Sequence, residues 1–383
     1  MSATPQALDG LKVLEFGGYA AGPHIGKMLA NFGATVVHVE SMNRPDGFRM
    51  QYPPYKDGKP GIDSGGCFAY FNDSKLGITL ELKHPQGVAL AKRLCDWCDI
   101  IIENMRPGVM ERLGLGCQAL RQSNPGLIML STCNMGQTGP RADTPGFGSQ
   151  LTALAGMCGL TGERGGPPML LYGPYIDFIA STLGAAAVLA ALEKRRRTGT
   201  GSDLDLSQYE CGLLFLAGPL LEYHTSGRIA ERAGNDDPDA VLHGAYPCAN
   251  GTWIALSCWS QEEYQRLLAV TAPREPSEWL AAREADVAAR ALQAAGVHAH
   301  AVNTVADLFT DPQLAARRLW RRRRHPVLGN QAYCFPAFDL SETPGEITRA
   351  APALGADNEQ VFRGLLGLTT EEFAAYDAAG AFD

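Results

Sequence analysis

Asp177 is the residue in this chain that is best placed for covalent chemistry. It follows Gly173-Pro174-Tyr175-Ile176 and precedes a stretch without charged residues, 178–192. A carboxylate at a helix start commonly serves as an N-cap or first-turn acid. Hydrogen bonds from helix N–H groups would also keep it ionised and positioned as a nucleophile. The local sequence therefore leaves a structural and a catalytic role open.

The other reactive residues form weaker patterns. Cys95 and Cys98 make a CxxC motif, but it lies in a helical pattern, and no second pair stands at metal-ligand spacing. The His residues form no HExxH motif, and no GxSxG motif occurs. The sequence therefore gives little support to a zinc enzyme or a serine hydrolase, and we predict no metal site.

Arginines form the strongest local charge feature, at Arg317, Arg318 and residues 321–324. Phosphate or nucleic-acid binding is one interpretation of this run. The whole chain has 33 basic and 41 acidic residues, a net charge of −8, so it lacks a general basic field. This balance favours a solvated helix end, and we predict no nucleic-acid partner.

Strands and helices alternate over the first 200 residues, which predicts an α/β fold with a Rossmann-like, doubly wound parallel sheet. Hydrophobic patterns give strands at 11–16, 35–39, 99–103, 127–132 and 203–206, and helices at 24–31, 84–98, 175–194 and 208–226. The Gly-rich turn before the first helix could approach a dinucleotide, with Glu40 in the place of a ribose-binding acid. Its spacing is not GxGxxG, which weighs against a nicotinamide dehydrogenase.

A polar stretch at 232–239 marks a change of composition. After it, strands at 246–248 and 253–257 and helices at 261–270 and 279–295 predict a smaller α+β domain. Residues 1–9 lack a secretory pattern, and the longest apolar stretches are too short to span a bilayer. The ten Cys residues are scattered, as is typical of a reducing compartment. We therefore expect a cytoplasmic protein without a membrane partner.

An ordered set of short segments resembles the class III CoA-transferase family. The most specific segments are 103–108, with the sequence ENMRPG, and 112–115, with the sequence RLGL. The others are 8–15, 21–23, 29–34, 36–40, 72–75, 79–83, 124–125, 136–140, 198–201, 294–297, 311–314, 352–355 and 366–368. The resemblance therefore extends over nearly the whole chain.

The resemblance implies an enzyme that moves CoA from an acyl-CoA to a small free carboxylic acid. Asp177 matches the family nucleophile, which forms a mixed anhydride with the acyl group. Asn104, Met105 and Arg112 match positions that hold the CoA nucleotide, and Leu80 matches an apolar contact to the adenine. The CoA thioester is then a substrate, and no tightly bound cofactor is expected.

The resemblance also implies an architecture. A large discontinuous domain would comprise residues 1–225 and 326–383, with a small α+β domain inserted at 226–325. Two such chains would interlock as a homodimer. A hetero-oligomer with a paralogous subunit is the alternative assembly.

Some positions depart from particular members of the family. Phe147 and Gly148 stand where α-methylacyl-CoA racemases carry a His-Asp pair, so the second base for proton exchange is missing. Ala20 and Ser41 replace a glutamine and an arginine of formyl-CoA transferase, which leaves oxalate and formate unsupported. The small domain is shorter than usual. An acyl-CoA racemase and a non-catalytic CoA-binding subunit therefore remain the alternatives.

Overall fold

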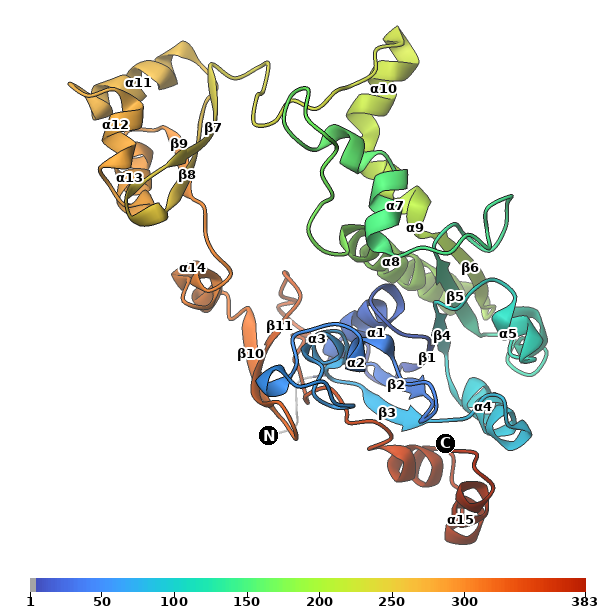
Figure 1. The fold of residues 1–383 in the computed structure, drawn as a ribbon. Coiled ribbons are helices and arrows are strands. Elements are labelled where there is room, and N and C mark those ends of the chain that lie inside the picture. Colours follow the sequence, from blue (N-terminus) through green and yellow to red (C-terminus); the bar gives the residue numbers. More distant parts are fainter. Residues whose placement is uncertain (1–4) are drawn as a thin grey trace. The chain divides into compact units, whose positions relative to one another are not determined.

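A computed structural model describes residues 5–383 of the chain (Figure 1). The chain forms two compact units. Among the described residues, unit 1 comprises 5–155, 171–217 and 318–383, and unit 2 comprises 156–170 and 218–317. The ranges expected for the two domains, 1–225 with 326–383 and 226–325, stay predictions.

Unit 1 is built on a six-stranded parallel sheet with the order β3-β2-β1-β4-β5-β6 (Figure 1). Its strands are β1 (Lys12–Phe16), β2 (Thr35–Glu40), β3 (Leu76–Thr79), β4 (Ile100–Glu103), β5 (Ile128–Cys133) and β6 (Ser202–Ser207). The order extends in both directions from the first strand, as in doubly wound folds. The predicted fold class is therefore confirmed, although β3 had not been expected.

Helices cover both faces of this sheet, because successive strand residues point to opposite sides. On one face, α1 (Ala21–Asn31) and α8 (Tyr175–Thr198) bury Ile25 and Val188 against strand residues such as Val13. On the other face, α4 (Pro85–Trp97) buries Leu90 and Leu94 against Leu14. The remaining helices of this part of the chain are short: α2 (Gly47–Met50), α3 (Gly66–Asn72), α5 (Val109–Arg112), α6 (Cys117–Leu120), α7 (Gly148–Leu154) and α9 (Gln208–Leu213).

The C-terminal segment packs on unit 1. Val361 and Phe362, in a π-helical turn (Gln360–Leu365), join the core formed by α4 and the sheet. The last helix, α15 (Thr370–Ala378), begins with a capping box in which Thr369 and Glu372 exchange hydrogen bonds. The segment after residue 318 is thus an integral part of the larger unit.

Residues 321–324 of the arginine run form a strand, so the predicted helix end is wrong for them, although Arg317 is the C-cap of the short helix α14 (Pro312–Ala316). Strand β10 (Trp320–His325) pairs antiparallel with β11 (Gly329–Cys334). Alternate side chains face one way, so Arg321 and Arg323 both lie near Glu346, with nitrogen-to-carboxylate distances of 3.6 and 3.1 Å. A period of two is invisible when every residue in the run has the same charge, which explains the error.

Unit 2 contains a three-stranded antiparallel sheet, β7-β8-β9, with helices packed on it (Figure 1). Its elements are β7 (Leu242–Pro247), β8 (Trp253–Cys258), β9 (His298–Ala301), α11 (Gln261–Thr271), α12 (Pro276–Ala281), α13 (Ala285–Ala294) and α14 (Pro312–Ala316); α10 (Ala217–Ser226) precedes β7. The α+β architecture agrees with the prediction. The single helix expected over 279–295 is two helices, which are separated at residues 282–284.

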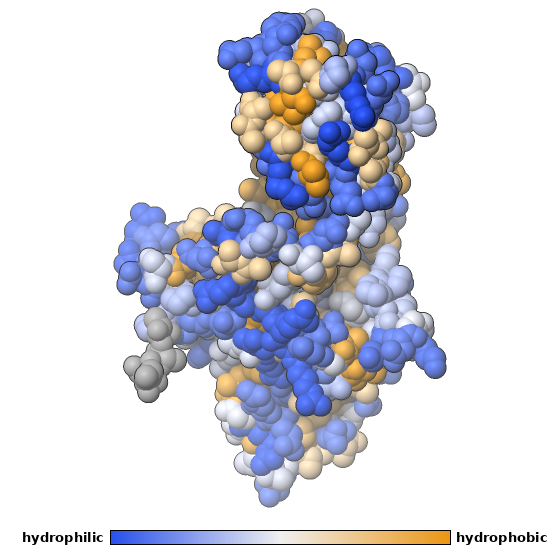
Figure 2. Space-filling view, turned by 90° about the vertical axis from the view of Figure 1, so that its left-hand side faces the viewer, coloured by the Kyte–Doolittle hydropathy of each residue, from blue (hydrophilic) through white to orange (hydrophobic). Residues whose placement is uncertain are grey.

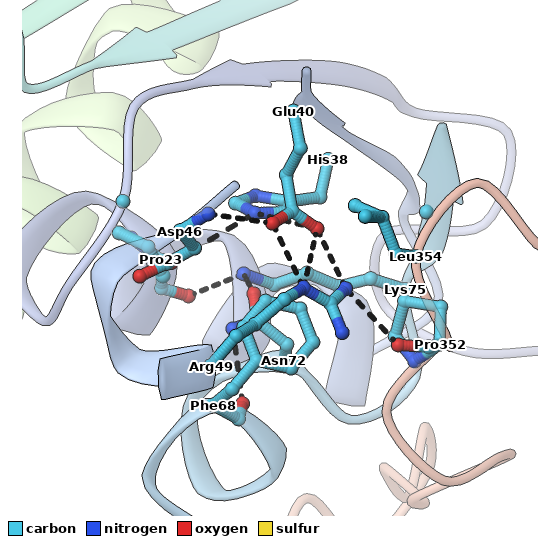
Figure 3. A network of polar contacts seen from close by, with 12 residues as sticks. Pro23, His38, Glu40, Asp46, Arg49, Phe68, Asn72, Lys75, Pro352 and Leu354 are labelled. Carbon is cyan, nitrogen blue, oxygen red and sulfur yellow. Dashed lines mark hydrogen bonds and ion pairs between the residues drawn. The ribbon is translucent and has the colours of Figure 1, made fainter. Parts of the chain in front are cut away.

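Strands β1 and β2 carry buried charged side chains, which are joined by Lys75 just before β3. Lys75 Nζ lies 2.8 Å from Glu15 Oε1, and His38 Nδ1 lies 2.5 Å from the same oxygen. Beside this cluster, Arg49 Nη2 donates to Glu40 Oε2 at 2.6 Å (Figure 3). Burial alone would raise the pKa of Glu15, but Lys75 and His38 hold it below its usual value. Glu40 is therefore engaged by Arg49 rather than displayed to a ribose, which removes the remaining support for a dinucleotide site.

Helix α8 is long and apolar enough to cross a membrane by length and composition alone. Core helices pass the same test, and α8 packs against α1 and β5 within unit 1. The face of the molecule seen in Figure 2 carries hydrophilic side chains with scattered hydrophobic ones. In the structure 33% of the apolar window of α8 is buried, so this helix is a partly buried element of unit 1.

Candidate active site

A large cavity lies in unit 1 at the carboxyl edge of the sheet. Its volume is about 970 Å³, and it is lined by residues that follow β1, β2, β3, β4 and β5 and by residues of α7 and α8. Ligands of open α/β sheets bind at this edge, because the loops after parallel strands converge there. The lining residues discussed below are Gly17, Gly18, Tyr19, Arg44, Asp46, Leu80, Lys83, Asn104, Met105, Arg106, Asp143, Phe147, Gly148 and Asp177.

Asp177 occupies the first turn of α8, and its carboxylate lines the cavity. Burial raises the pKa of this carboxyl group to about 7, because desolvation outweighs a hydrogen bond from its own backbone N–H. The expectation that helix N–H groups keep it fully ionised is therefore wrong near neutral pH. A carboxyl group poised near pH 7 can exist as a nucleophile under ordinary conditions.

Gly148 allows the Asp177 carboxylate to lie against the main chain. A methyl group built on Gly148 would overlap Asp177 Oδ2, and it would lie 3.2 Å from Cγ and 3.4 Å from the Cα of Pro174. The backbone of Gly148 is helical and does not itself require glycine. Glycine is therefore required at this position because the Asp177 carboxylate occupies the space of a side chain.

Two side chains hold the Gly-rich loop after β1 from opposite sides. Asn104 accepts a hydrogen bond from the Gly18 N–H at 3.0 Å and donates to the Gly18 carbonyl at 2.7 Å. Asp46 accepts from the N–H of Tyr19 at 3.0 Å. Tyr19 has a φ of 64°, in the left-handed region, which for a non-glycine residue requires such external support. The loop N–H groups of Gly18 and Tyr19 are thus used within the protein.

Basic residues line the cavity on the loops after β2, β3 and β4. These residues are Arg44, Lys83 and Arg106, and all three are exposed. Strands β2 and β3 are neighbours at one end of the sheet, whereas Asp177 belongs to α8, which packs on β5 and β6. The loops after β2 and β3, with Arg44 and Lys83, therefore form the cationic side of the cavity, whereas Arg106 follows β4, the neighbour of β5.

The sequence profile of CoA-transferase family III matches residues 8–278 and 273–358, which is most of the chain. The chain belongs to CoA-transferase family III. It is 34% identical over 397 residues to succinyl-CoA–D-citramalate CoA-transferase of Chloroflexus aurantiacus, with 98% of each protein covered. It is also 32% identical over 391 residues to the alpha subunit of succinyl-CoA–L-malate CoA-transferase from Chloroflexus aurantiacus, covering 95% of this chain and 90% of that protein.

A solved structure of this family has the same fold. A CaiB/BaiF family protein from Brucella suis superposes with a TM-score of 0.85 at 27% identity, covering 94% of this chain and 100% of that one. The two Chloroflexus relatives are named CoA-transferases. This chain is an enzyme of the same class, and the acyl-CoA metabolism implied by the sequence resemblance is confirmed at this level.

Four of the five residues singled out from the sequence line this cavity. Asp177, Leu80, Asn104 and Met105 do so, and Leu80 is buried. Arg112, at the end of α5, is exposed and does not contribute to the lining. The roles of these residues stay predictions.

Several lining residues were missed by sequence reasoning. These residues include three cations that each stand a few residues after a strand: Arg44, Lys83 and Arg106. Asp46 lies in the same loop as Arg44. A basic residue after a strand of a parallel sheet is the signal that could have identified the first three.

The two thiols of the CxxC motif are buried and resist ionisation. Burial raises the pKa of Cys95 to about 12, and the Cys98 thiol donates to the Cys95 carbonyl at 3.4 Å. Both thiols are buried in the core. Within residues 5–383, no group of three or more His, Cys, Asp or Glu side chains could hold a metal ion.

Proposed function

We propose that this enzyme transfers CoA between an acyl-CoA and a free carboxylic acid through a mixed anhydride on Asp177. The observation that carries the proposal is the Asp177 carboxylate, which lines the cavity and has a pKa raised to about 7. A carboxylate activated by desolvation and fixed by packing meets the needs of a nucleophile. The cavity volume of about 970 Å³ suits a large, extended substrate such as an acyl-CoA.

The CoA phosphates would lie on the cationic side of the cavity. Arg44, Lys83 and Arg106 are available for charge-assisted hydrogen bonds to phosphate oxygens. Neighbouring parallel strands lie about 4.8 Å apart, so β3 and β5 are separated by about 19 Å. A pantetheine arm can extend over such a distance and bring the thioester to Asp177. Met105 would offer apolar surface to the nucleotide, and the buried Leu80 would support that surface from within. Arg112 does not line the cavity and is kept only as a proposed phosphate contact.

The exchange requires four displacements that return Asp177 to its starting state. The carboxylate attacks the thioester carbon, the C–S bond breaks, and CoA leaves as a thiolate. The thiolate then attacks the aspartyl carbon of the anhydride, which releases the donor acid and leaves an aspartyl-CoA thioester. The acceptor carboxylate displaces CoA from that thioester to form a second anhydride. The thiolate finally attacks the acceptor carbon, which yields the new acyl-CoA and the free Asp177 carboxylate.

We propose a homodimer as the working assembly. Leu214 and Phe215, which follow α9, are exposed to 66% and 63%, and such apolar side chains indicate a covered surface. The alpha-subunit name of the malate relative makes a hetero-oligomer the alternative assembly. All ten cysteines are free, which supports a reducing cytoplasm.

Trapping the anhydride tests the mechanism directly. After incubation with an acyl-CoA and hydroxylamine, we expect a hydroxamate at Asp177, because hydroxylamine captures an activated aspartyl carbonyl. Peptide mass spectrometry locates the modified residue, with CoA-free enzyme as the control. An adduct only at another residue, or no adduct with any acyl-CoA, would refute the assignment.

The pH dependence of the first chemical step follows from the raised pKa of Asp177. Only the deprotonated carboxylate attacks, so kcat/KM should fall about tenfold per pH unit below pH 7 and level off above it. The measurement is kcat/KM for a single acyl-CoA between about pH 5 and pH 9, with enzyme stability checked at each pH. A profile that is flat across pH 7 contradicts the predicted protonation state.

A further inference from the structure

We propose that Tyr19 and Phe147 form the acyl subsite and make the enzyme prefer apolar, planar monocarboxylic acids, such as arylacetic acids, over dicarboxylic acids. This inference rests on the proposed role of Asp177 and names the class of acid that reaches it. This class of acid differs from the dicarboxylic acids, such as malate and citramalate, that appear in the names of the two Chloroflexus relatives.

The position of Phe147 in the sequence places it beside the nucleophile. It directly precedes Gly148, whose Cα lies against the Asp177 carboxylate. The Phe147 ring meets the Tyr19 ring edge to face, with centroids 5.7 Å apart and planes at 69°. Both residues line the cavity. When a thioester carbonyl is at Asp177, we expect its acyl carbons to lie against this aromatic pair.

The Tyr19 ring is fixed in place before any substrate binds. Its backbone N–H is held by Asp46, and its hydroxyl donates to Gln51 Oε1 at 2.8 Å. Its ring lies directly on Gly47, where any side chain would overlap ring atoms. The Phe48 ring supports it at 5.4 Å between centroids. A rigid aromatic surface of this kind binds a flat apolar group with little loss of conformational freedom.

The charges around this subsite disfavour a second carboxylate on the substrate. Among the described residues, the Lys and Arg side chains that line the cavity all stand on the loops after β2, β3 and β4. In the described part of the chain, no Lys or Arg contributes to the pKa shift of Asp177, whereas Arg44 acts on the Tyr19 hydroxyl and opposes the rise in its pKa. The Asp177 end of the subsite therefore offers no cation to pair with a second carboxylate. Asp46 and Asp143, which also line the cavity, add negative charge. A neutral acyl body avoids both the unpaired charge and the repulsion.

Substrate competition tests this subsite on the intact enzyme. We expect kcat/KM for phenylacetyl-CoA to exceed that for succinyl-CoA by at least about tenfold. Phe147→Ala should lower the value for phenylacetyl-CoA by about 10–100-fold, mainly through KM, and change the value for acetyl-CoA less than about threefold. Phe147 is 54% exposed, so its truncation leaves the core intact. The matched control is Phe338→Ala, at an aromatic residue that is 53% exposed and outside the cavity, which should change neither value.

Binding without turnover gives a second measurement. Phenylacetate should compete with phenylacetyl-CoA more strongly than succinate does, and Phe147→Leu should weaken that inhibition while the bulk of the side chain remains. A preference for succinyl-CoA, or equal loss for acetyl-CoA and phenylacetyl-CoA in Phe147→Ala, overturns the subsite. If hydroxylamine still traps Asp177 with succinyl-CoA in that case, the mechanism stands and only the subsite fails. If no acyl-CoA gives the Asp177 adduct, both proposals fail together.

Discussion

Asp177→Ala is expected to lower the exchange of labelled CoA between an acyl-CoA and a free acid by at least about 10⁴-fold. The variant removes the only atoms that form the anhydride in the proposed route. Asp177→Asn should lose as much, because the amide keeps the size of the side chain but is not a nucleophile. CoA affinity should change little in both variants, since the phosphates are expected on the far side of the cavity. Isotope exchange measures the rate, and calorimetric titration with CoA measures the affinity.

The control for this pair of variants lies on the same helix. Glu193→Gln, near the other end of α8, removes an exposed carboxylate that pairs with Arg196 at 2.8 Å. Exposed pairs of this kind contribute less than about 1 kcal/mol, so exchange should remain at the wild-type rate. Residual exchange in Asp177→Asn within tenfold of wild type would place the nucleophile elsewhere.

The fold could be predicted largely from sequence because its strands are buried. In β1, β2, β4 and β5, apolar residues run together without alternation, as in sheets that are covered on both faces. Strand β3 (Leu76–Thr79) contains a glycine that interrupts its apolar run, whereas the equally short β4 has three consecutive isoleucines. Strand β10 contains four consecutive arginines. Its two faces therefore carry the same residue type and differ only in the residues that they contact. Strand β3 pairs with β2 and β10 pairs with the adjacent β11, and the apolar pattern of the sequence indicates neither pairing.

The candidate site was only partly predictable, for a related reason. Local physics allowed two roles for Asp177, and the family resemblance favoured the catalytic one. Arg44, Lys83 and Arg106 come together only because β2, β3 and β4 lie in one parallel sheet, and the order of strands cannot be read from the chain. Most elements of unit 1 were predicted, but the convergence of their loops required the structure.

Asn104 illustrates how a correctly placed residue can have unexpected contacts. The sequence resemblance implied that it contacts the CoA nucleotide. In the structure both ends of its amide bind the backbone of Gly18. A methyl group on Gly17 would also overlap Asn104 Oδ1. The side chain thus supports the loop that carries Tyr19, and any contact with the nucleotide would have to be compatible with that support.

Gly148→Ala tests whether the position of the Asp177 carboxylate, and not only its presence, is required. The added methyl group would overlap Asp177 Oδ2, so either the carboxylate rotates away or α7 shifts. A displacement of about 1 Å at a reacting group can cost about 100-fold in rate, and we expect kcat to fall by about that factor. KM for the acyl-CoA should change much less, because the cationic loops are untouched. Steady-state kinetics with one acyl-CoA separates the two constants.

The interpretation of Gly148→Ala depends on the fold being retained, and the local geometry favours this. Gly148 has helical backbone angles, and alanine is the better helix former, so the backbone itself is not strained. Gly364→Ala is the matched control, because a methyl group at that position meets no atom within 4 Å, and its kcat should equal that of wild type. If Gly148→Ala keeps the wild-type kcat, the carboxylate does not need its present position, and a nucleophile held against the α7 backbone is the wrong description of the site. If kcat falls and the Asp177 hydroxamate falls with it, the close packing of Gly148 on Asp177 is required for the chemical step.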